Sequence, residues 1–277
     1  MLEAERRRLI AKIVQQRSVV AVTELVETLG ASEATIRRDV NAMAEHGLVR
    51  RIRGGVESLT PRHEAHLVGM PFELSRGIAV AEKRAIARAA AALIKDGDSI
   101  IIGGGTTTSA LVEFLVDRQL DILSNSMPIV TQLFATSRNR VMVPGGTIFR
   151  EQNIVLSPYE SDATENFWGQ KLFLGCYGLS RFGMTETDPL IVQAQVKLVK
   201  RAEELVVMAD SRKFRQRSSM VVAPLDRISV IITDDGASGE ELEPFRTAGI
   251  KVIVAKVREE EPRKPLLPND GSAAAAE

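Results

Sequence analysis

The feature of this chain that most limits its possible folds is an alternation, from residue 78 onward, of short apolar runs with longer amphipathic segments. The runs expected to be strands are residues 99–102, 121–123, 141–143, 171–176, 205–209, 229–233 and 251–254. The segments expected to be helices are residues 82–95, a stretch ending at Leu115, and residues 128–135, 158–167, 191–203 and 239–248. Because apolar strands that alternate with helices form parallel sheets buried on both faces, residues 78–256 are predicted to fold as an α/β domain.

A glycine- and threonine-rich segment follows the first of these strands. Residues 103–108 read GGGTTT and open a helix. Glycines let the backbone approach an anion, N–H groups at a helix start point toward it, and hydroxyls add donors, so the segment suits a phosphate. It lacks the G-K-[ST] of a P-loop and the third glycine of the dinucleotide fingerprint. A simple tight turn between strand and helix is the alternative.

Polar side chains follow other predicted strands as well. Ser124-Asn125-Ser126 offers groups that bind sugar hydroxyls, Pro144-Gly145-Gly146 follows the next strand, and Asp210-Ser211-Arg212-Lys213-Phe214 places a carboxylate beside cations. Lys197 lies among apolar residues of a helix. Ligands of open α/β sheets bind at the carboxyl ends of the strands, so these groups are expected to converge there.

A second kind of pattern occupies residues 32–55, SEATIRRDVNAMAEHGLVRRIRGG. Ser32 is expected to cap a helix that buries Ile36, Val40 and Met43 and ends at Gly47. Residues 48–52 are expected to form a strand, followed by a tight turn at Gly54-Gly55. Together these elements predict a helix followed by a basic β-wing.

Two further helices are expected before this segment, at residues 5–16 and 23–29, with a β-prone run at 19–22 between them. Helix, glycine-containing turn and capped second helix is the layout of a helix-turn-helix, whose second helix enters the major groove of DNA. The residues expected to contact bases or phosphates are Ser32, Ala34, Thr35, Arg37 and Arg38 on the helix and Arg50, Arg51 and Arg53 on the wing.

The charge of the N-terminal segment supports binding to DNA, whereas the charge of the whole chain does not. The whole chain has a formal net charge of zero, whereas residues 1–56 carry 10 Lys and Arg residues against 7 Asp and Glu, a net charge of +3. A three-helix packing module with solvated arginines, in a structural or protein-interaction role, is the alternative. It leaves the basic Arg-Arg-x-Arg-Gly-Gly wing unexplained.

Residues 6–56, through SEATIRRD, GLVRR and RGG, resemble the winged helix-turn-helix of DeoR-type bacterial regulators of sugar catabolism. GGGTTT, LSNSMPI, PGG, GCYGLS, QVKLVKRA and ADSRKF fall in the order of the DeoR sensor domain, which is similar to ribose-5-phosphate isomerase. The resemblance implies a repressor that binds double-stranded operator DNA as a homo-oligomer, a dimer or tetramer, and is released by a phosphorylated sugar. It implies an effector site made of Gly104, Gly105, Thr106, Thr107, Thr108, Asn125, Lys197, Asp210 and Lys213.

One departure from the family pattern concerns the isomerase-like segment. Where the isomerase has a catalytic aspartate, this chain has Cys176-Tyr177-Gly178. Moving a proton between adjacent carbons needs a carboxylate, and a tyrosine with a pKa near 10 is a poor substitute. We therefore expect no catalytic residue, with an isomerase carrying an accessory N-terminal module as the alternative function.

The remaining features indicate no cofactor, metal or membrane span. Cys176 is the only cysteine, which excludes an internal disulfide and suits the cytoplasm. His63 and His66 form an incomplete metal site. No apolar run approaches the ~18 residues of a membrane helix. The predicted organisation is a winged domain at 1–57, a linker at 58–77, the α/β domain at 78–256 and a disordered tail at 257–277, with a capping box at Ser157-Pro158-Tyr159-Glu160.

Overall fold

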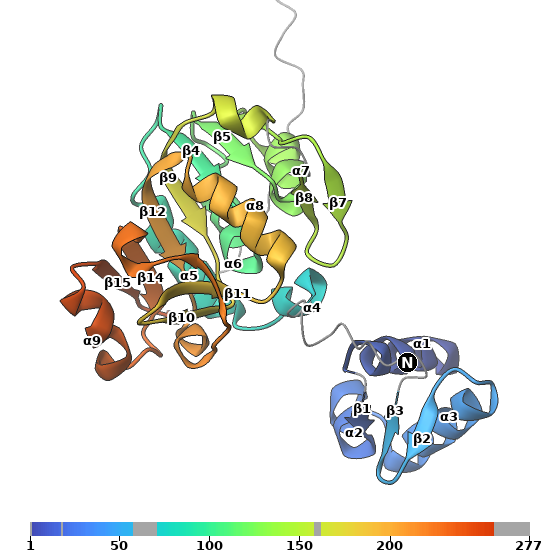
Figure 1. Ribbon diagram of the computed structural model, residues 1–277. Helices are drawn as coiled ribbons and strands as arrows, with labels where there is room; N and C mark the ends of the chain where they lie inside the picture. The colour runs from blue at the N-terminus through green and yellow to red at the C-terminus, as the bar shows by residue number, and fades with distance from the viewer. Residues whose placement is uncertain (1, 18, 58–70, 158–161, 258–277) are drawn as a thin grey trace, which may run out of the picture. The chain divides into compact units, whose positions relative to one another are not determined.

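A computed structural model describes residues 2–17, 19–57, 71–157 and 162–257. The chain divides into two compact units, Met1–Val68 and Gly69–Glu277, and each is described by itself (Figure 1). Some predictions fall outside the described residues: the His63 and His66 pair, most of the predicted linker, the Pro158-Tyr159-Glu160 part of the capping box, and the tail from residue 258.

Over its described residues, the first unit contains three helices and a small antiparallel sheet of strand order β1-β3-β2. The elements are α1 Glu3–Arg17, β1 Val19–Ala21, α2 Val22–Leu29, α3 Glu33–Glu45, β2 Arg50–Ile52 and β3 Gly55–Glu57. Helix α3 begins as expected, because Ser32 Oγ accepts a hydrogen bond from the backbone N–H of Thr35 over 3.3 Å. The helix buries Ile36, Val40 and Met43 in the core of the unit, which confirms the predicted apolar face.

The predicted wing is a hairpin of β2 and β3, in which Arg51 pairs with Val56 and Gly54 takes a positive φ of 77° in the turn. The strand is shorter than the predicted 48–52, because Leu48 follows Gly47 in the turn after α3 and is exposed. Gly47 adopts a φ of 67°, the left-handed conformation that ends a helix.

Within residues 71–157 and 162–257, the second unit is built on a seven-stranded sheet of order β15-β14-β12-β9-β4-β5-β6, with every neighbouring pair parallel. The strands are β4 Ser99–Ile102, β5 Asp121–Ser124, β6 Arg140–Met142, β9 Gly169–Leu174, β12 Ala202–Met208, β14 Val230–Asp234 and β15 Lys251–Ala255. The sequence-based prediction of an α/β domain with a parallel sheet is therefore confirmed.

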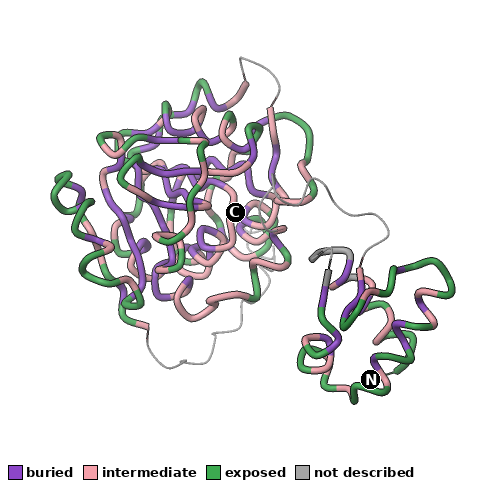
Figure 2. The backbone as a smooth tube through the Cα atoms, turned by 60° about the horizontal axis from the view of Figure 1, so that its bottom comes forward, coloured by how far each residue is buried: buried purple, intermediate pink, exposed green. Residues whose placement is uncertain are grey.

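Helices cover both faces of this sheet, and successive strand residues alternate between the faces. Ile100 and Ile102 pack with α5 (Val80–Ala91) and α7 (Met127–Thr136), whereas Ile101 packs with α8 (Pro189–Val199) and α9 (Gly239–Thr247) in a second core. Figure 2 shows the strands between these layers as largely buried.

The strand order reverses at β4. From β4 the chain proceeds outward through β5 and β6, and it then returns to β9 on the other side of β4 before continuing to β12, β14 and β15. A crevice at the carboxyl ends of the strands opens at such a switch point, so the loops after β4 and β9 are where a ligand is expected.

Several predicted helices have different bounds. The helix predicted to end at Leu115 is a four-residue α6 (Thr106–Ser109) continued by the 3₁₀ helix η1 (Ala110–Phe114). The Thr108 hydroxyl donates to the carbonyl oxygens of Gly103 and Gly105, and such bonds compete with regular helix. The helix predicted at 191–203 ends at Val199, because the chain enters β12 at Ala202.

The other differences from the sequence-based expectations concern short elements without a clear period. Of the helix predicted over 158–167, the described residues 162–167 contain only the 3₁₀ helix η2 (Ala163–Asn166). Part of the predicted linker is helical, since α4 (Phe72–Arg76) buries Phe72. The sequence analysis did not find the hairpin of β7 (Thr147–Phe149) and β8 (Ile154–Leu156), or the antiparallel sheet of β10 (Gly178–Ser180), β11 (Gly183–Glu186) and β13 (Met220–Ala223).

No helix of the described ranges is long and apolar enough to cross a membrane.

Candidate functional site

The outer face of α3 carries the first group of predicted contact residues. Ser32, Ala34, Arg37 and Arg38 are exposed and Thr35 is half-buried. Ser32 Oγ also lies 2.8 Å from Thr35 Oγ1, so both hydroxyls serve the start of the helix while remaining at its accessible end. All five residues therefore lie on or beside the first turns of one helix, away from the core.

The arginines of this surface have weak partners or none. Arg37 pairs with the exposed Glu33 at 2.6 Å, Arg50 pairs with Glu57 at 2.7 Å, and Arg51 donates to Asn41 Oδ1 over 3.0 Å. Among the described residues, no hydrogen bond or ion pair engages Arg38 or Arg53. Exposed ion pairs contribute only about 0 to 1 kcal/mol, so these guanidinium groups can exchange their partners for phosphate at little cost.

A buried carboxylate, which sequence reasoning did not single out, fixes the orientation of α3. Asp39 is 2% exposed and accepts from Arg6 Nε at 2.5 Å and from Arg7 Nε at 3.1 Å, both on α1. Its place on the buried side of α3, between Ile36 and Val40, was the available signal. Two charge-assisted bonds to one carboxylate hold α1 and α3 together, so Asp39 positions the exposed face of α3.

The glycine loop after β4 is shaped by close contacts. Gly105 has a φ of 146°, which a residue with a side chain rarely adopts. A Cβ on Gly104 would lie 2.3 Å from a methyl group of Ile154 on β8, so the hairpin leaves no room for a side chain there. Thr107 and Thr108 are buried, and the Thr108 hydroxyl is occupied by the loop's own carbonyl oxygens. Of the three predicted threonines, Thr106 is the one that is only half-buried.

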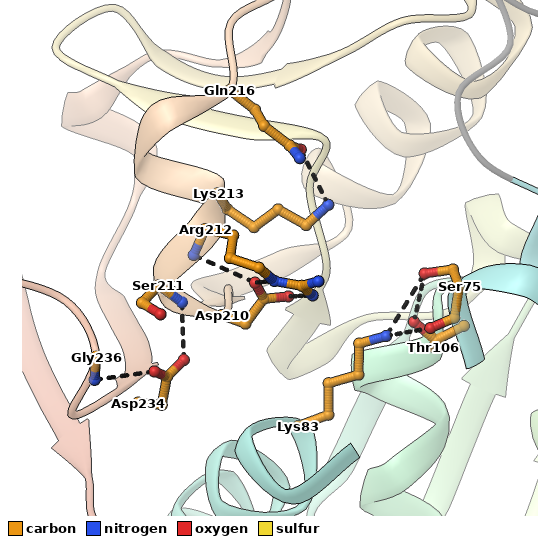
Figure 3. Close-up of polar contacts among 10 residues, drawn as sticks. All are labelled: Ser75, Lys83, Thr106, Asp210, Ser211, Arg212, Lys213, Gln216, Asp234 and Gly236. Carbon is orange, nitrogen blue, oxygen red and sulfur yellow. Dashed lines mark hydrogen bonds and ion pairs between the residues drawn. The ribbon is translucent and has the colours of Figure 1, made fainter. Parts of the chain in front are cut away.

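Charged residues surround the carboxyl ends of β12 and β14 (Figure 3). Asp210 is 1% exposed and binds the Arg212 guanidinium through both oxygens, at 2.7 and 3.0 Å. Asp234 accepts from the backbone N–H groups of Ser211 at 2.7 Å and Gly236 at 3.0 Å. The predicted carboxylate at position 210 therefore holds a neighbouring arginine in place, and the two aspartates together order the loop that presents Arg212 and Lys213.

Lys83 on α5 also belongs to this cluster, although sequence reasoning missed it. Its side chain is 4% exposed, and its Nζ donates to the Ser75 carbonyl oxygen at 2.5 Å. Burial lowers the pKa of Lys83 to about 8; the charges of Arg212 and Lys213 add to this, while Asp210 opposes it. A lysine among the alanines of an otherwise apolar helix face was the signal in the sequence.

Two other predicted effector residues line a cavity of about 410 Å³ between the β7–β8 hairpin and α8. Asn125 and Lys197 both face this cavity, and Lys197 pairs there with Asp162 at 2.7 Å. Burial opposes the charge on Asp162, but hydrogen bonds from Lys197 and Thr164 outweigh it and hold the pKa of this carboxyl well below its usual range. The remaining lining is mainly apolar, including Ile148, Phe149, Val155, Leu156, Leu190 and Leu198.

A third set of side chains surrounds the segment after β9. Lys213 Nζ lies 5.8 Å from the centre of the Tyr177 ring and donates to Gln216 Oε1 at 3.2 Å. Burial raises the pKa of Glu186 to about 7 against the opposing effects of Gln195 and Lys213. Burial also raises the pKa of the Cys176 thiol to about 12, so this thiol is not a nucleophile at neutral pH.

Comparison with known proteins identifies both units. Residues 6–62 match the DeoR-like helix-turn-helix domain, and residues 78–235 match the DeoR C terminal sensor domain. The chain belongs to the DeoR family. The HTH-type transcriptional regulator UlaR of Shigella dysenteriae is 31% identical over 253 residues, which are 91% of this chain and 99% of the relative. UlaR of Escherichia coli O1:K1 matches to the same extent.

Solved structures resemble the DeoR-family chain more distantly. The sorbitol operon regulator SorC of Klebsiella pneumoniae is 11% identical with a TM-score of 0.33, covering 93% of this chain and 97% of that one. Ribose 5-phosphate isomerase A of Methanocaldococcus jannaschii is 16% identical with a TM-score of 0.35, covering 47% and 52%.

The predicted effector residues of this DeoR-family chain thus lie in two adjoining groups. Thr106, Asp210 and Lys213 lie in the charged cluster of Figure 3, whereas Asn125 and Lys197 line the cavity. In the part of the chain that the structure describes, no group of three or more His, Cys, Asp or Glu side chains could hold a metal ion.

Proposed function

We propose that this DeoR-family protein is a DNA-binding repressor of a carbohydrate-catabolism operon, released from its operator by a phosphorylated sugar bound in the second unit. The observation that carries the proposal is the presence, in one chain, of a DeoR-like helix-turn-helix domain and a DeoR sensor domain. The relatives at 31% identity are named as transcriptional regulators and not as enzymes. The family resemblance of the Cys176-Tyr177-Gly178 segment implies a tyrosine in place of the isomerase aspartate.

The DNA contact is assigned to the exposed surface of α3 and the wing. Arg38, which has no partner among the described residues, reaches base edges or phosphates, and Arg53 holds a backbone phosphate. The full set is Ser32, Ala34, Thr35, Arg37, Arg38, Arg50, Arg51 and Arg53. A single module makes too few contacts for specificity, so the protein acts as a homo-oligomer on repeated half-sites. As a transcriptional regulator it works in the cytoplasm.

The effector is assigned to the carboxyl edge of the seven-stranded sheet. Its phosphate lies against the backbone of Gly104 and Gly105 and the hydroxyl of Thr106, and its sugar extends toward Asn125 and Lys197. Thr107, Thr108 and Asp210 support the site from its buried side, and Lys213 supplies charge. Coupling free energies between two sites are typically ~1 to 3 kcal/mol, so the effector lowers DNA affinity by about 5- to 150-fold.

The experiment is a titration of operator fragments from the neighbouring genome at several salt concentrations, with and without phosphorylated sugars. Specific binding that weakens steeply as salt rises, and weakens further with one sugar phosphate, supports the proposal. Arg140→Ala, on the exposed edge of β6, is the matched control for Arg38→Ala. Failure of the folded protein to bind any fragment at low ionic strength contradicts the proposal, as does turnover of ribose 5-phosphate.

A further inference from the structure

Lys83 is a buried cation whose direct partners are uncharged. Its Nζ lies 2.5 Å from the carbonyl oxygen of Ser75 and 3.5 Å from Ser75 Oγ. Among the described residues, no carboxylate forms an ion pair with it. A buried ammonium without a paired anion is costly, and buried charges are normally paired with an opposite charge.

The surroundings of Lys83 are those of an anion site. Ser75 Oγ lies 3.2 Å from Thr106 Oγ1, so one residue of α4 joins Lys83 to the first residue of α6, next to the glycine loop (Figure 3). Arg212 and Lys213 are close enough for their charges to act on Lys83. Asp210 also acts on it, but both oxygens of this carboxylate are bound to Arg212.

We propose that Lys83 binds the anionic group of the effector directly, in company with Thr106, and that the anion competes with Ser75 of α4 for both side chains. This inference rests on the effector site of the proposed function and adds a residue and a mechanism to it. A phosphate oxygen accepts a stronger hydrogen bond from an ammonium than a serine carbonyl or hydroxyl does, because both partners are charged. The chemical class recognised is a phosphate ester or another compact dianion.

The competition links the effector to a defined helix. Helix α4 is anchored by the backbone N–H of Phe72, which donates to the carbonyl oxygen of Glu151 at 2.9 Å, and by the buried Phe72 ring. Its carboxyl-terminal part is held by Ser75. Helix α4 is the first helix that the structure describes after the wing in chain order. An anion that takes Lys83 and Thr106 from Ser75 therefore changes the contacts of the first described helix of the second unit.

The test measures binding of inorganic phosphate to the full chain by calorimetry at pH 7.5, without DNA. Lys83→Met should weaken phosphate binding by about 10- to 100-fold, the loss expected for one charge-assisted hydrogen bond. The matched control Lys251→Met removes an exposed lysine at the amino end of β15, on the opposite edge of the sheet, and should bind phosphate as the wild type does. Circular dichroism checks that each variant is folded.

Ser75→Ala separates direct binding from a structural role. It removes the hydroxyl that contacts Thr106 and Lys83 and keeps the backbone carbonyl that accepts from Lys83. Phosphate binding should therefore be unchanged or several-fold tighter. A loss as large as that of Lys83→Met would show that the Ser75 hydroxyl supports anion binding and does not compete with the anion, and would overturn the proposal. Unchanged binding in folded Lys83→Met, or no phosphate binding by the wild type, would overturn it too. If phosphate binding depends on Lys83 but the protein does not bind operator DNA, this inference stands and the proposed function as a DNA-binding repressor is refuted.

Discussion

The backbone N–H of Gly104 donates a hydrogen bond to Oδ1 of Asn125 over 3.1 Å, and this bond joins the loop after β4 to the loop after β5. Asn125 also faces the cavity beside α8, so one amide side chain touches both groups of candidate effector residues. The glycine loop and the cavity are therefore two parts of one edge of the sheet, with Asn125 between them.

Asn125→Asp is expected to keep this bond and to weaken effector binding. A carboxylate accepts from Gly104 as an amide oxygen does, but it adds a negative charge beside the expected phosphate and repels it. We expect sugar-phosphate affinity to fall about 10-fold or more. The unfolding temperature should fall as well, because Asn125 is 4% exposed and the new carboxylate is buried. Calorimetry measures the affinity and thermal denaturation measures the unfolding temperature. Unaltered affinity would show that the phosphate does not bind beside this loop.

Arg38→Ala and Arg53→Ala should affect DNA binding differently. Arg38 lies on the exposed face of α3 near its start, so its loss should cost about 1 to 3 kcal/mol of operator binding and reduce the preference for operator over unrelated DNA. Arg53 lies in the turn of the wing, where its loss should weaken binding to all sequences and lower the salt slope by about one. Titrations against both kinds of DNA distinguish these results. Equal losses on both kinds of DNA for Arg38→Ala would contradict the assignment of base contact.

Asp39→Asn should destabilise the first unit without changing the second. The neutral amide leaves Arg6, which is 13% exposed, without its buried counter-charge. Breaking one side of such a pair is strongly destabilising, and we expect roughly 2 to 4 kcal/mol here because the arginines retain some contact with water. Hydrogen exchange of the full chain should show faster exchange in α1 and α3 and unchanged exchange in β4 and β9. Unchanged protection in α1 would mean that apolar packing alone holds these helices.

Anion binding should weaken as the pH rises through the pKa of Lys83, about 8. The bound anion favours the charged ammonium, so above this pKa binding requires uptake of a proton and affinity falls by up to about tenfold per pH unit. The charged groups that act on Lys83 are Asp210, Arg212, Lys213 and Glu82. Sulfate is the suitable probe because its charge is constant over this range.

The control for that pH profile is Lys83→Arg, whose guanidinium stays protonated and should give a flat profile. A decline of equal steepness in wild type and variant would assign the titration to another group.

Glu186 should make the protein less stable as the pH rises from about 4.5 to about 7. Burial raises the pKa of this carboxyl to about 7, so over this interval the unfolded chain has lost a proton that the folded chain retains. Stability due to this group is therefore greatest at low pH and falls with rising pH, by roughly 2 to 4 kcal/mol. Glu186→Gln should remove this component, which denaturant unfolding at pH 5 and pH 7.5 would reveal. An identical pH dependence in the variant would contradict it.

Local sequence patterns were sufficient to predict α3 and the seven strands of the parallel sheet. Apolar residues three and four apart predicted α3, Ser32 predicted its start, and uninterrupted apolar runs such as Ile100–Ile102 predicted strands buried on both faces. Residues directly after those strands were also identifiable as site candidates, because the carboxyl ends of parallel strands meet at one edge. The period of a helix, its capping residue and the apolar run of a buried strand are each set by residues that are close in sequence. These features could therefore be predicted from the sequence alone.

Tertiary structure alone decided which of these residues meet and what each one binds. Ser75 contacts both Lys83 and Thr106, and it lies on a helix that the sequence analysis assigned to the linker. The Asp210 carboxylate binds the guanidinium of Arg212. The β7–β8 hairpin that closes over Gly104 left no period in the sequence. The physical reason is that the contacts of Ser75 with Lys83 and Thr106, and of Ile154 with Gly104, join residues 8 to 50 positions apart. Their geometry follows from packing across the sheet and not from local preference.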